Sequence, residues 1–526
     1  MNMKKMKRLV ALALSVVMVL AMSVVAFAAT GDNTSEGTTT GSNTYYTITA
    51  PDNGHTYEVY QIFTGDLNPD GKTFSSLKWG KNGKNATEGT DVDESVIKAL
   101  TAVNSSSDTE KLAVIKTYAN LSNPVATVTN ENPYKAVAGY YLIKDRESSV
   151  PAGDTNTLYI VEVVGNVTIS PKSEKPSFEK KIKDTNDTTG KTSGWQDSAD
   201  YDIGDSVPFQ LKGTVAADYA NYEKYYFAFH DIEETGLTFN EDSVNVYVEN
   251  TDSEGNIRTT PLVKDTDYKI VKPGKEKTEQ CTFEIIFDNL KDIESVVAGS
   301  RIIAEYTSTL NEQAVLGNQG NVNKAKLEFS NNPNDTQGGT PSTGETPWDN
   351  VIVFTYKVVV NKVDSNSKPL KGAEFTLSKK VKVTDENGKE KEEERIIAVI
   401  NGEDKTTFTF KGLDDGEYTL SETKTPDGYN TISPIKFTVT AQHEIEWTSI
   451  ETRNDVLTSL SGNAASGEIT FTPSISDGSL STNVVNNKGS QLPSTGGIGT
   501  TIFYVVGGIL MVGAAVLLIT KRRAEN

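Results

Sequence analysis

The chain has 526 residues and carries 51 Lys plus Arg against 71 Asp plus Glu, a formal net charge of −20 at pH 7. This acidic balance argues against nucleic acid or anionic lipid as a partner. Cys281 is the only cysteine, which excludes an intrachain disulfide, so stability must come from packing or from another kind of cross-link.

The N-terminus has the features of a secretion signal. Basic residues between Lys4 and Arg8 precede an apolar run from Leu9 to about Val25, and Ala26-Phe27-Ala28 offers the small residues of a cleavage site. We therefore expect residues 1–28 to be a signal peptide that is removed on export. The Ser/Thr/Gly-rich residues 29–44 are expected to be a disordered lead.

The first folded region, residues 45–172, combines strand and helix patterns. Strand-like segments lie near both ends, at 57–60 and 159–164. Between them, two apolar series recur at helical spacing: Val96, Leu100, Val103 and Leu112, Ile115, Tyr118. These patterns predict a β-rich domain with a helical insertion.

Two further β domains are expected before residue 489. Residues 173–335 alternate apolar and polar side chains without a convincing long helix, and residues 351–488 again contain short strand-like segments, which favours β-sandwiches. A Pro/Lys segment at 171–176 and a Gly/Pro/Thr-rich linker at 336–350 separate the regions. The expected fold is therefore mainly β, with three tandem domains.

The third region places polar side chains in phase with core residues. Lys362 continues an alternating apolar series, Glu422 shares a strand face with Leu420, and Asn486 shares one with Val484. A carboxyl group on a core-facing position must be neutral, paired or hydrogen-bonded. Desolvation would lower the pKa of the amine and raise that of the carboxyl, so this set can form a spontaneous Lys-Asn amide with the loss of ammonia.

The middle region repeats the pattern with an aspartate. Lys180, Asp231 and Asn331 are each in phase with apolar neighbours on a first, a middle and a last strand. A plainer interpretation is that these are strand-end polar groups, with the lysine reaching solvent. A one-residue slip in register would move the three uncertain positions to Lys181, Asn332 or Asn487.

The C-terminal residues 489–526 contain an ordered series of signals. Leu492-Pro493-Ser494-Thr495-Gly496 precedes an uncharged run, Ile498 to Thr520, which as a helix would reach roughly 34 Å and could cross a bilayer. Lys521-Arg522-Arg523 would then stay on the cytoplasmic side. The run alone indicates only a membrane anchor, but the order resembles the cell-wall sorting signal of Gram-positive surface proteins, Leu-Pro-any-Thr-Gly. The resemblance implies that a sortase cysteine attacks the Thr495 carbonyl, that Gly496 leaves, and that an amine resolves the acyl-enzyme.

Other motifs resemble the major (backbone) pilins of Gram-positive bacteria. The segment from Tyr418 to Tyr429 is similar to the pilin E-box, although Thr425 stands where the family has Ala. Lys362-Val363-Asp364 matches the first-strand lysine step, and Ser330 to Pro333 is similar to the end of the pilin middle domain. The resemblance implies immunoglobulin-like, collagen-adhesin-type sandwiches that form isopeptide bonds, with Glu422 and Asp231 catalysing only their own cross-links.

A last resemblance concerns polymerisation. Ile169-Ser170-Pro171-Lys172 is similar to the pilin motif whose lysine resolves the acyl-enzyme, although Ser170 replaces the family's Tyr. Lys172 is therefore the expected joining lysine. Lys175 is its rival.

These observations lead to a hypothesis and two alternatives. The chain is expected to be a wall-anchored pilus shaft subunit that serves adhesion, with a pilin sortase, a housekeeping sortase, identical subunits and peptidoglycan precursor as partners; minor pilins are left open. A monomeric wall-anchored adhesin is the main alternative. An anchored enzyme is disfavoured, because the three histidines and the absence of a nucleophile elbow or phosphate-binding Gly loop indicate no turnover site. No cofactor and no metal site are expected.

Overall fold

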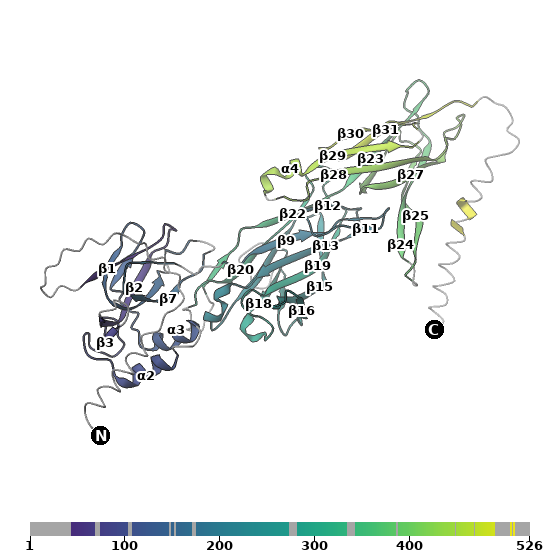
Figure 1. The fold of residues 1–526 in the computed structure, drawn as a ribbon. Helices are drawn as coiled ribbons and strands as arrows, with labels where there is room; N and C mark the ends of the chain where they lie inside the picture. Colours follow the sequence, from purple (N-terminus) through teal and green to yellow (C-terminus); the bar gives the residue numbers. More distant parts are fainter. Residues whose placement is uncertain are drawn as a thin grey trace, which may run out of the picture.

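The structure is a computed structural model in which three β modules follow one another in a row (Figure 1). It describes residues 44–68, 74–103, 108–146, 149–151, 154–170, 175–272, 281–333, 342–384, 388–447, 449–465, 467, 469–489, 505–507 and 509–510. The expected signal peptide, most of the expected lead, Lys172 and the pentapeptide Leu492 to Gly496 lie outside these residues. Within the described part, no helix is long and apolar enough to cross a membrane.

The N-terminal module has two sheets and two helices. The larger sheet has the order β3-β2-β6-β7 with β4 beside β2, and the smaller has the order β5-β1-β8. The strands are β1 (Tyr45–Thr49), β2 (Tyr57–Leu67), β3 (Phe74–Trp79), β4 (Ala126–Val128), β5 (Tyr134–Val137), β6 (Gly139–Asp145), β7 (Leu158–Val163) and β8 (Val167–Thr168). The helices α2 (Glu94–Ala102) and α3 (Asp108–Thr117) form the predicted insertion. Val96, Leu100 and Ile115 of these helices face the core of the N-terminal module, as their helical spacing predicts.

The middle sandwich packs a seven-stranded sheet, β12-β22-β20-β14-β18-β17 with β21 beside β20, on a five-stranded sheet, β16-β15-β19-β13-β9. Its strands are β9 (Phe178–Ile182), β12 (Ser198–Asp200), β13 (Ser206–Thr214), β14 (Phe227–Glu233), β15 (Leu237–Thr251), β16 (Ile257–Pro261), β17 (Lys269–Val271), β18 (Phe283–Phe287), β19 (Arg301–Leu310), β20 (Asn321–Ser330), β21 (Thr343–Glu345) and β22 (Asp349–Phe354). A small hairpin, β10 (Thr185–Asn186) and β11 (Lys191–Thr192), stands apart, and the single-turn helices are η3 (Ala217–Asn221) and η4 (Leu290–Asp292). The alternation of each strand places one face in a shared apolar core.

The C-terminal sandwich packs β26-β23-β31-β30 on β25-β24-β27-β28-β29. Its strands are β23 (Tyr356–Asp364), β24 (Ala373–Thr384), β25 (Glu390–Gly402), β26 (Thr407–Leu413), β27 (Gly416–Lys424), β28 (Ile435–His443), β29 (Leu457–Ala464), β30 (Thr472–Ser474) and β31 (Ser479–Asn486). The short helices η5 (Ile450–Thr452) and α4 (Arg453–Val456) lie before β29. The first strand, β23, runs parallel to the last, β31, and this pairing positions the site described below.

The middle and C-terminal sandwiches are closely joined. The expected linker at 336–350 is instead part of the middle sheet, because it holds β21, which pairs with β20, and the start of β22, which lies between β12 and β20. Only Thr355 separates β22 from β23. Ile203 donates its amide hydrogen to Gly412 O at 3.0 Å. Gly412 has φ +76°, and a Cβ there would lie 2.6 Å from Ile203 Cδ1. The fold is mainly β with several sandwich domains, as the sequence predicts.

Candidate functional site

The C-terminal sandwich brings Lys362, Glu422 and Asn486 into one buried cluster. They come from β23, β27 and β31, and Lys362 and Asn486 are both 0% exposed. Asn486 Nδ2 donates to Glu422 Oε1 at 2.9 Å and to Oε2 at 3.0 Å. Lys362 Nζ donates to the backbone oxygen of Val484 at 3.0 Å. The three predicted residues therefore lie together in the core.

Strand register explains why these residues meet. In the parallel pair β23 and β31, Lys362 lies beside Val484 and Asp364 lies beside Asn486, so the lysine and the amide point into the core from adjacent strands. Asn487 faces solvent, which excludes the one-residue slip on β31. Asn486 Oδ1 is buried without a hydrogen-bond partner among the described residues, so it can accept a proton donor.

Burial makes the Lys362 amine reactive. Desolvation lowers the pKa of Lys362 from 10.5 to about 8, although the charge of Glu422 opposes the shift. A substantial fraction of this amine is therefore a neutral nucleophile near neutral pH. An ordinary surface lysine would be almost fully charged there.

The middle sandwich contains a second buried lysine cluster. Lys180 Nζ donates to Asp231 Oδ2 at 2.6 Å and to the Tyr306 hydroxyl at 2.7 Å. Tyr306 donates in turn to Asp231 Oδ2 at 2.7 Å, and the side chains of Lys180 and Asp231 are 0% exposed. Lys181 is half-buried and instead pairs with Asp197 at 2.6 Å, so the slip to Lys181 is not supported.

The carboxamide of this second cluster is Asn323, not the predicted Asn331. Asn323 Nδ2 donates to the Tyr306 hydroxyl at 2.9 Å, and Asn323 is fully buried. Asp231 lies opposite Ala325 across β14 and β20, so Asn331 is six residues further along, roughly 20 Å away at about 3.3 Å per residue. Asn331 lies at the border with the N-terminal module, where its carbonyl oxygen accepts the Asn156 amide at 2.6 Å.

The alternation along this segment narrows the position of the amide to a few asparagines without choosing among them. The phase that includes Leu327, Phe329 and Asn331 also includes Ala325, Asn323 and Asn321, so in-phase asparagines lie at the start of β20 and directly after its end. Only the register against β14 decides between them. Asn332 is buried but has the opposite phase.

Electrostatics in the middle cluster favour neutral forms. Burial raises the pKa of Asp231 and lowers that of Lys180, and it raises the pKa of the neighbouring Glu233 to about 8. Asn323 Oδ1 is buried without a hydrogen-bond partner among the described residues, like its counterpart in the C-terminal sandwich. Both clusters thus hold an amine, an acid and a carboxamide, the groups that amide exchange requires.

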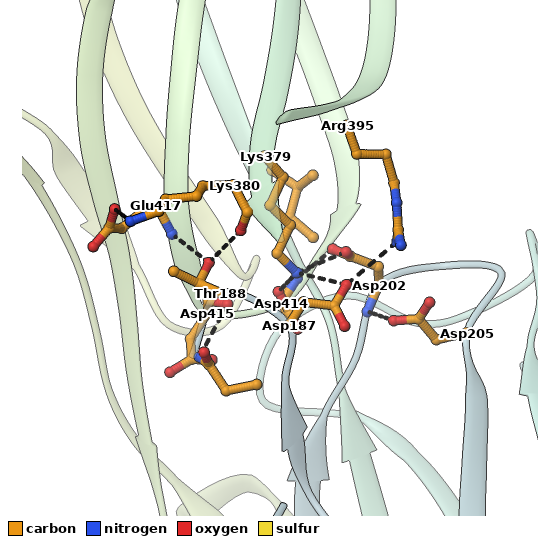
Figure 2. Close-up of polar contacts among 12 residues, drawn as sticks. Asp187, Thr188, Asp202, Asp205, Lys379, Lys380, Arg395, Asp414, Asp415 and Glu417 are labelled. Atoms are coloured by element: carbon orange, nitrogen blue, oxygen red, sulfur yellow. Dashed lines mark hydrogen bonds and ion pairs between the residues drawn. The ribbon is translucent and has the colours of Figure 1, made fainter. Parts of the chain in front are cut away.

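A third buried lysine joins the two sandwiches and is shown in Figure 2. Lys379, on β24, donates to Asp414 Oδ1 and, at 2.8 Å, to Asp202 Oδ2 of the middle sandwich. Asp187, also from the middle sandwich, lies 3.6 Å from the same nitrogen. Burial alone would lower the pKa of Lys379, but the carboxylates of Asp414 and Asp202 raise it. Nothing in the sequence pattern singled out this lysine.

The predicted polymerisation and sorting residues are mostly outside the described part. This holds for Lys172 and for Leu492, Pro493, Ser494, Thr495 and Gly496. The rival Lys175 is half-exposed and forms an ion pair with Asp154.

Comparison with protein families gives three separate matches. Residues 203–333 match the Gram-positive pilin backbone subunit 2, Cna-B-like domain, and residues 356–453 match a prealbumin-like fold domain. Residues 484–526 match the LPXTG cell wall anchor motif. The first two matches lie within the two regions predicted to be β-sandwiches, and the third covers the predicted sorting signal.

Individual proteins are also similar to this chain. The "Trypsin-resistant surface T6 protein" of Streptococcus pyogenes serotype M6 is 26% identical over 90% of this chain and 94% of its own length. The structure of the T6 backbone pilin of the same serotype covers 85% of this chain and 98% of its own, with 20% identity and a TM-score of 0.48. The major pilin SpaD of Corynebacterium diphtheriae covers the same shares with 18% identity and a TM-score of 0.45.

Proposed function

Because this chain is a Gram-positive pilus backbone subunit with an LPXTG cell-wall anchor, we propose that it forms a covalent shaft braced by two internal amide bonds. In the shaft, Thr495 of each subunit is joined to a lysine of its neighbour. The internal bonds are Lys362–Asn486 and Lys180–Asn323. The observation that carries this proposal is the burial of an amine, an acid and a carboxamide together in each sandwich.

The chemistry in the C-terminal sandwich needs no outside reactant. Asn486 Nδ2 faces Glu422 in the structure, so the carboxamide must turn to present Oδ1 before the reaction. Glu422, when protonated, then donates to Asn486 Oδ1 and makes the amide carbon more electrophilic. The neutral Lys362 amine attacks that carbon, which forms a bond between Lys362 Nζ and the side-chain carbon of Asn486. Glu422 then passes a proton from the lysine nitrogen to the leaving nitrogen, the Asn486 C–N bond breaks, and ammonia departs. One amine and one carboxamide thus yield one amide and one ammonia.

The middle sandwich uses the same steps with Asp231 as the acid. Asp231 is within hydrogen-bond distance of Lys180 Nζ, and Tyr306 bridges Lys180, Asp231 and Asn323. Tyr306 therefore positions the amine and the carboxamide on one oxygen. It is a positioning residue, because its hydroxyl need not exchange a proton for the reaction to balance.

The load path favours Lys172 as the joining lysine. Tension that enters ahead of Lys180 and leaves at Thr495 passes through both proposed amide bonds, whereas a lysine inside the N-terminal module would place an unlinked module under load. Lys175 satisfies the same order, but its amine is engaged by Asp154 and must leave that ion pair before it can attack. We therefore retain Lys172 and treat Lys175 as the second choice.

The proposal extends to surface behaviour. A shaft anchored to the wall would hold its tip away from the cell, which suits adhesion. Cross-linked sandwiches resist local unfolding, the step that exposes a chain to proteases. We expect the assembled protein to withstand trypsin, a property that the name of the T6 relative also states.

The test of shaft formation is a boiled wall extract on a denaturing gel. Wild type should give a ladder of covalent multimers, and Lys172→Ala should give monomer that is still attached to the wall. Thr495→Ala should abolish both. A ladder that persists in Lys172→Ala places the joining amine elsewhere, with Lys175 the next to test. A wild type that gives only a single heavy band, with its own sortases present, supports the monomeric adhesin.

A further inference from the structure

A cluster of metal-ligating side chains lies on the outer face of the middle sandwich, opposite the cross-link cluster. His230 on β14 stands directly across from Glu284 on β18. Cys281 lies just before β18, and all three side chains are buried. Alternation explains the placement, because Asp231 points into the core and its neighbour His230 therefore points out of it. No metal site is expected from the sequence, and His230 and Cys281 are 51 residues apart in it.

The three side chains converge on one point. His230 Nδ1 lies 3.0 Å from Glu284 Oε1 and 3.7 Å from Cys281 Sγ, and all three ligand atoms lie within 4.8 Å of one another. A tetrahedral zinc ion with bonds of about 2.0 Å to N and O and about 2.3 Å to S has ligand edges of roughly 3.3–3.6 Å. The two distances from His230 Nδ1, 3.0 Å to Glu284 Oε1 and 3.7 Å to Cys281 Sγ, lie just below and just above that range. A single N–H on His230 Nδ1 cannot point at both Glu284 Oε1 and Cys281 Sγ. A cation placed between the three ligand atoms would contact all of them.

The second ring nitrogen of His230 also has a carboxylate partner. His230 Nε2 lies 2.9 Å from Glu328 Oε2, and Thr343 donates to the second oxygen of Glu328 at 2.7 Å. A carboxylate on the far ring nitrogen is the arrangement that orients a metal-binding imidazole and makes it more basic. Lys326, which lies across β20 from His230, forms an ion pair with Glu345 at 2.7 Å.

We propose that His230 Nδ1, Cys281 Sγ and Glu284 Oε1 bind a divalent transition-metal ion of the zinc class. One thiolate, one imidazole and one carboxylate suit Zn²⁺ better than the all-oxygen cations Mg²⁺ and Ca²⁺. Three protein ligands leave a fourth position for water. The ion would tie the start of β18 to β14, a non-covalent brace back to back with the Lys180 cluster, and this assignment is independent of the amide bonds.

The test uses the full chain purified in detergent, treated with a chelator and then dialysed. Zn²⁺ titrated by calorimetry should bind at one ion per chain, and Co²⁺ in its place should give a thiolate-to-cobalt charge-transfer band. Since Cys281 is the only cysteine, that band can arise only from it. Glu328→Gln should weaken Zn²⁺ binding by about 10- to 100-fold, the usual effect of losing such an orienting carboxylate.

Two matched variants complete the design. Cys281→Ser should remove the cobalt band and the stoichiometric zinc site. His55→Gln should leave both unchanged, because His55 is also a buried histidine between two carboxylates but has no thiol nearby. A wild-type chain without the cobalt band overturns the proposal without reference to any variant. Zinc binding of equal affinity in Cys281→Ser also overturns it, since the ion would then sit on surface carboxylates.

Discussion

Lys362 and Lys379 are both fully buried in the C-terminal sandwich, yet their surroundings prepare them for opposite roles. Desolvation lowers the pKa of Lys362 to about 8 despite the opposing charge of Glu422. Lys379 contacts Asp414, Asp202 and Asp187, and its pKa is raised. Burial is common to both. The number of acidic neighbours decides whether the amine becomes a nucleophile or stays a charged partner.

The comparison also separates two ways of bracing the subunit. Lys362 lies near the Asn486 carboxamide, with which it can form a covalent amide bond. Lys379, among the described residues, hydrogen-bonds to aspartates and to no carboxamide. Lys379 instead gathers aspartates from both sandwiches at one nitrogen, Asp414 from its own and Asp202 and Asp187 from the middle one (Figure 2). We therefore expect a covalent brace within the sandwich and an ionic one between the sandwiches.

Removal of the acid should break the covalent brace. Glu422→Ala should leave Lys362 and Asn486 unjoined and lower the free energy of unfolding of the C-terminal sandwich by about 5 kcal/mol, the chain-entropy value for so long a loop. Urea unfolding measures the loss. Glu417→Ala, an exposed carboxylate on the same strand, is the matched control and should behave as wild type. An unchanged midpoint in Glu422→Ala would remove that residue from the mechanism.

The middle sandwich offers a test of which asparagine reacts. Asn323→Ala should be short of its own sequence mass by one ammonia where wild type is short by two, and the middle sandwich should be less stable by about 5 kcal/mol on the same argument. Asn331→Ala should lose the same ammonia as wild type, because that side chain lies far from Lys180. Mass spectrometry of the two variants side by side reports the difference. The opposite result would restore Asn331 as the partner.

Lys379→Met should break the ionic brace without changing the covalent chemistry. The variant should lose as many ammonia molecules as wild type, and its free energy of unfolding should fall by about 3–5 kcal/mol because buried aspartates lose their partner. Lys380→Met, at the next and more exposed position, should change little. If Lys379→Met retained an extra ammonia, Lys379 would belong with the reactive lysines.

The smallest expected effect is on pH dependence. Burial and the charges of Asp202 and Asp187 raise the pKa of Asp205 from 3.8 to about 6. Between these values the folded chain binds a proton that the unfolded chain has released, so this group's contribution to stability falls as pH rises through the window. Wild type should therefore gain on the order of 1–2 kcal/mol between pH 7 and pH 4 relative to Asp205→Asn. Parallel urea unfolding curves at the two pH values check this, and equal shifts in both proteins would contradict it.

Sequence reasoning placed the reactive side chains on the correct strand faces but did not fix every register. The period-two pattern placed Lys180, Asp231, Lys362, Glu422 and Asn486 on core faces, where the structure has them. It could not choose between the two ends of β20, because both asparagines have the same phase and only the register against β14 separates them. Helical spacing located α2 and α3 for the same local reason.

The contacts between the two sandwiches and the role of Tyr306 were beyond that reasoning. Lys379 and Asp202 are 177 residues apart and meet across two sandwiches, and Tyr306 is 75 residues from Asp231. No local pattern encodes such pairs. The linker expected at 336–350 shows the same limit, since its composition does not reveal that β21 and β22 pair with β20.

The most direct test of the internal amide bonds is the intact mass of the full chain, followed by fragmentation of its tryptic peptides. The account predicts a mass short of the sequence value by two ammonia molecules, with one branched peptide joining Lys362 to Asn486 and another joining Lys180 to Asn323. A full sequence mass, with all four residues recovered in linear peptides, would contradict it.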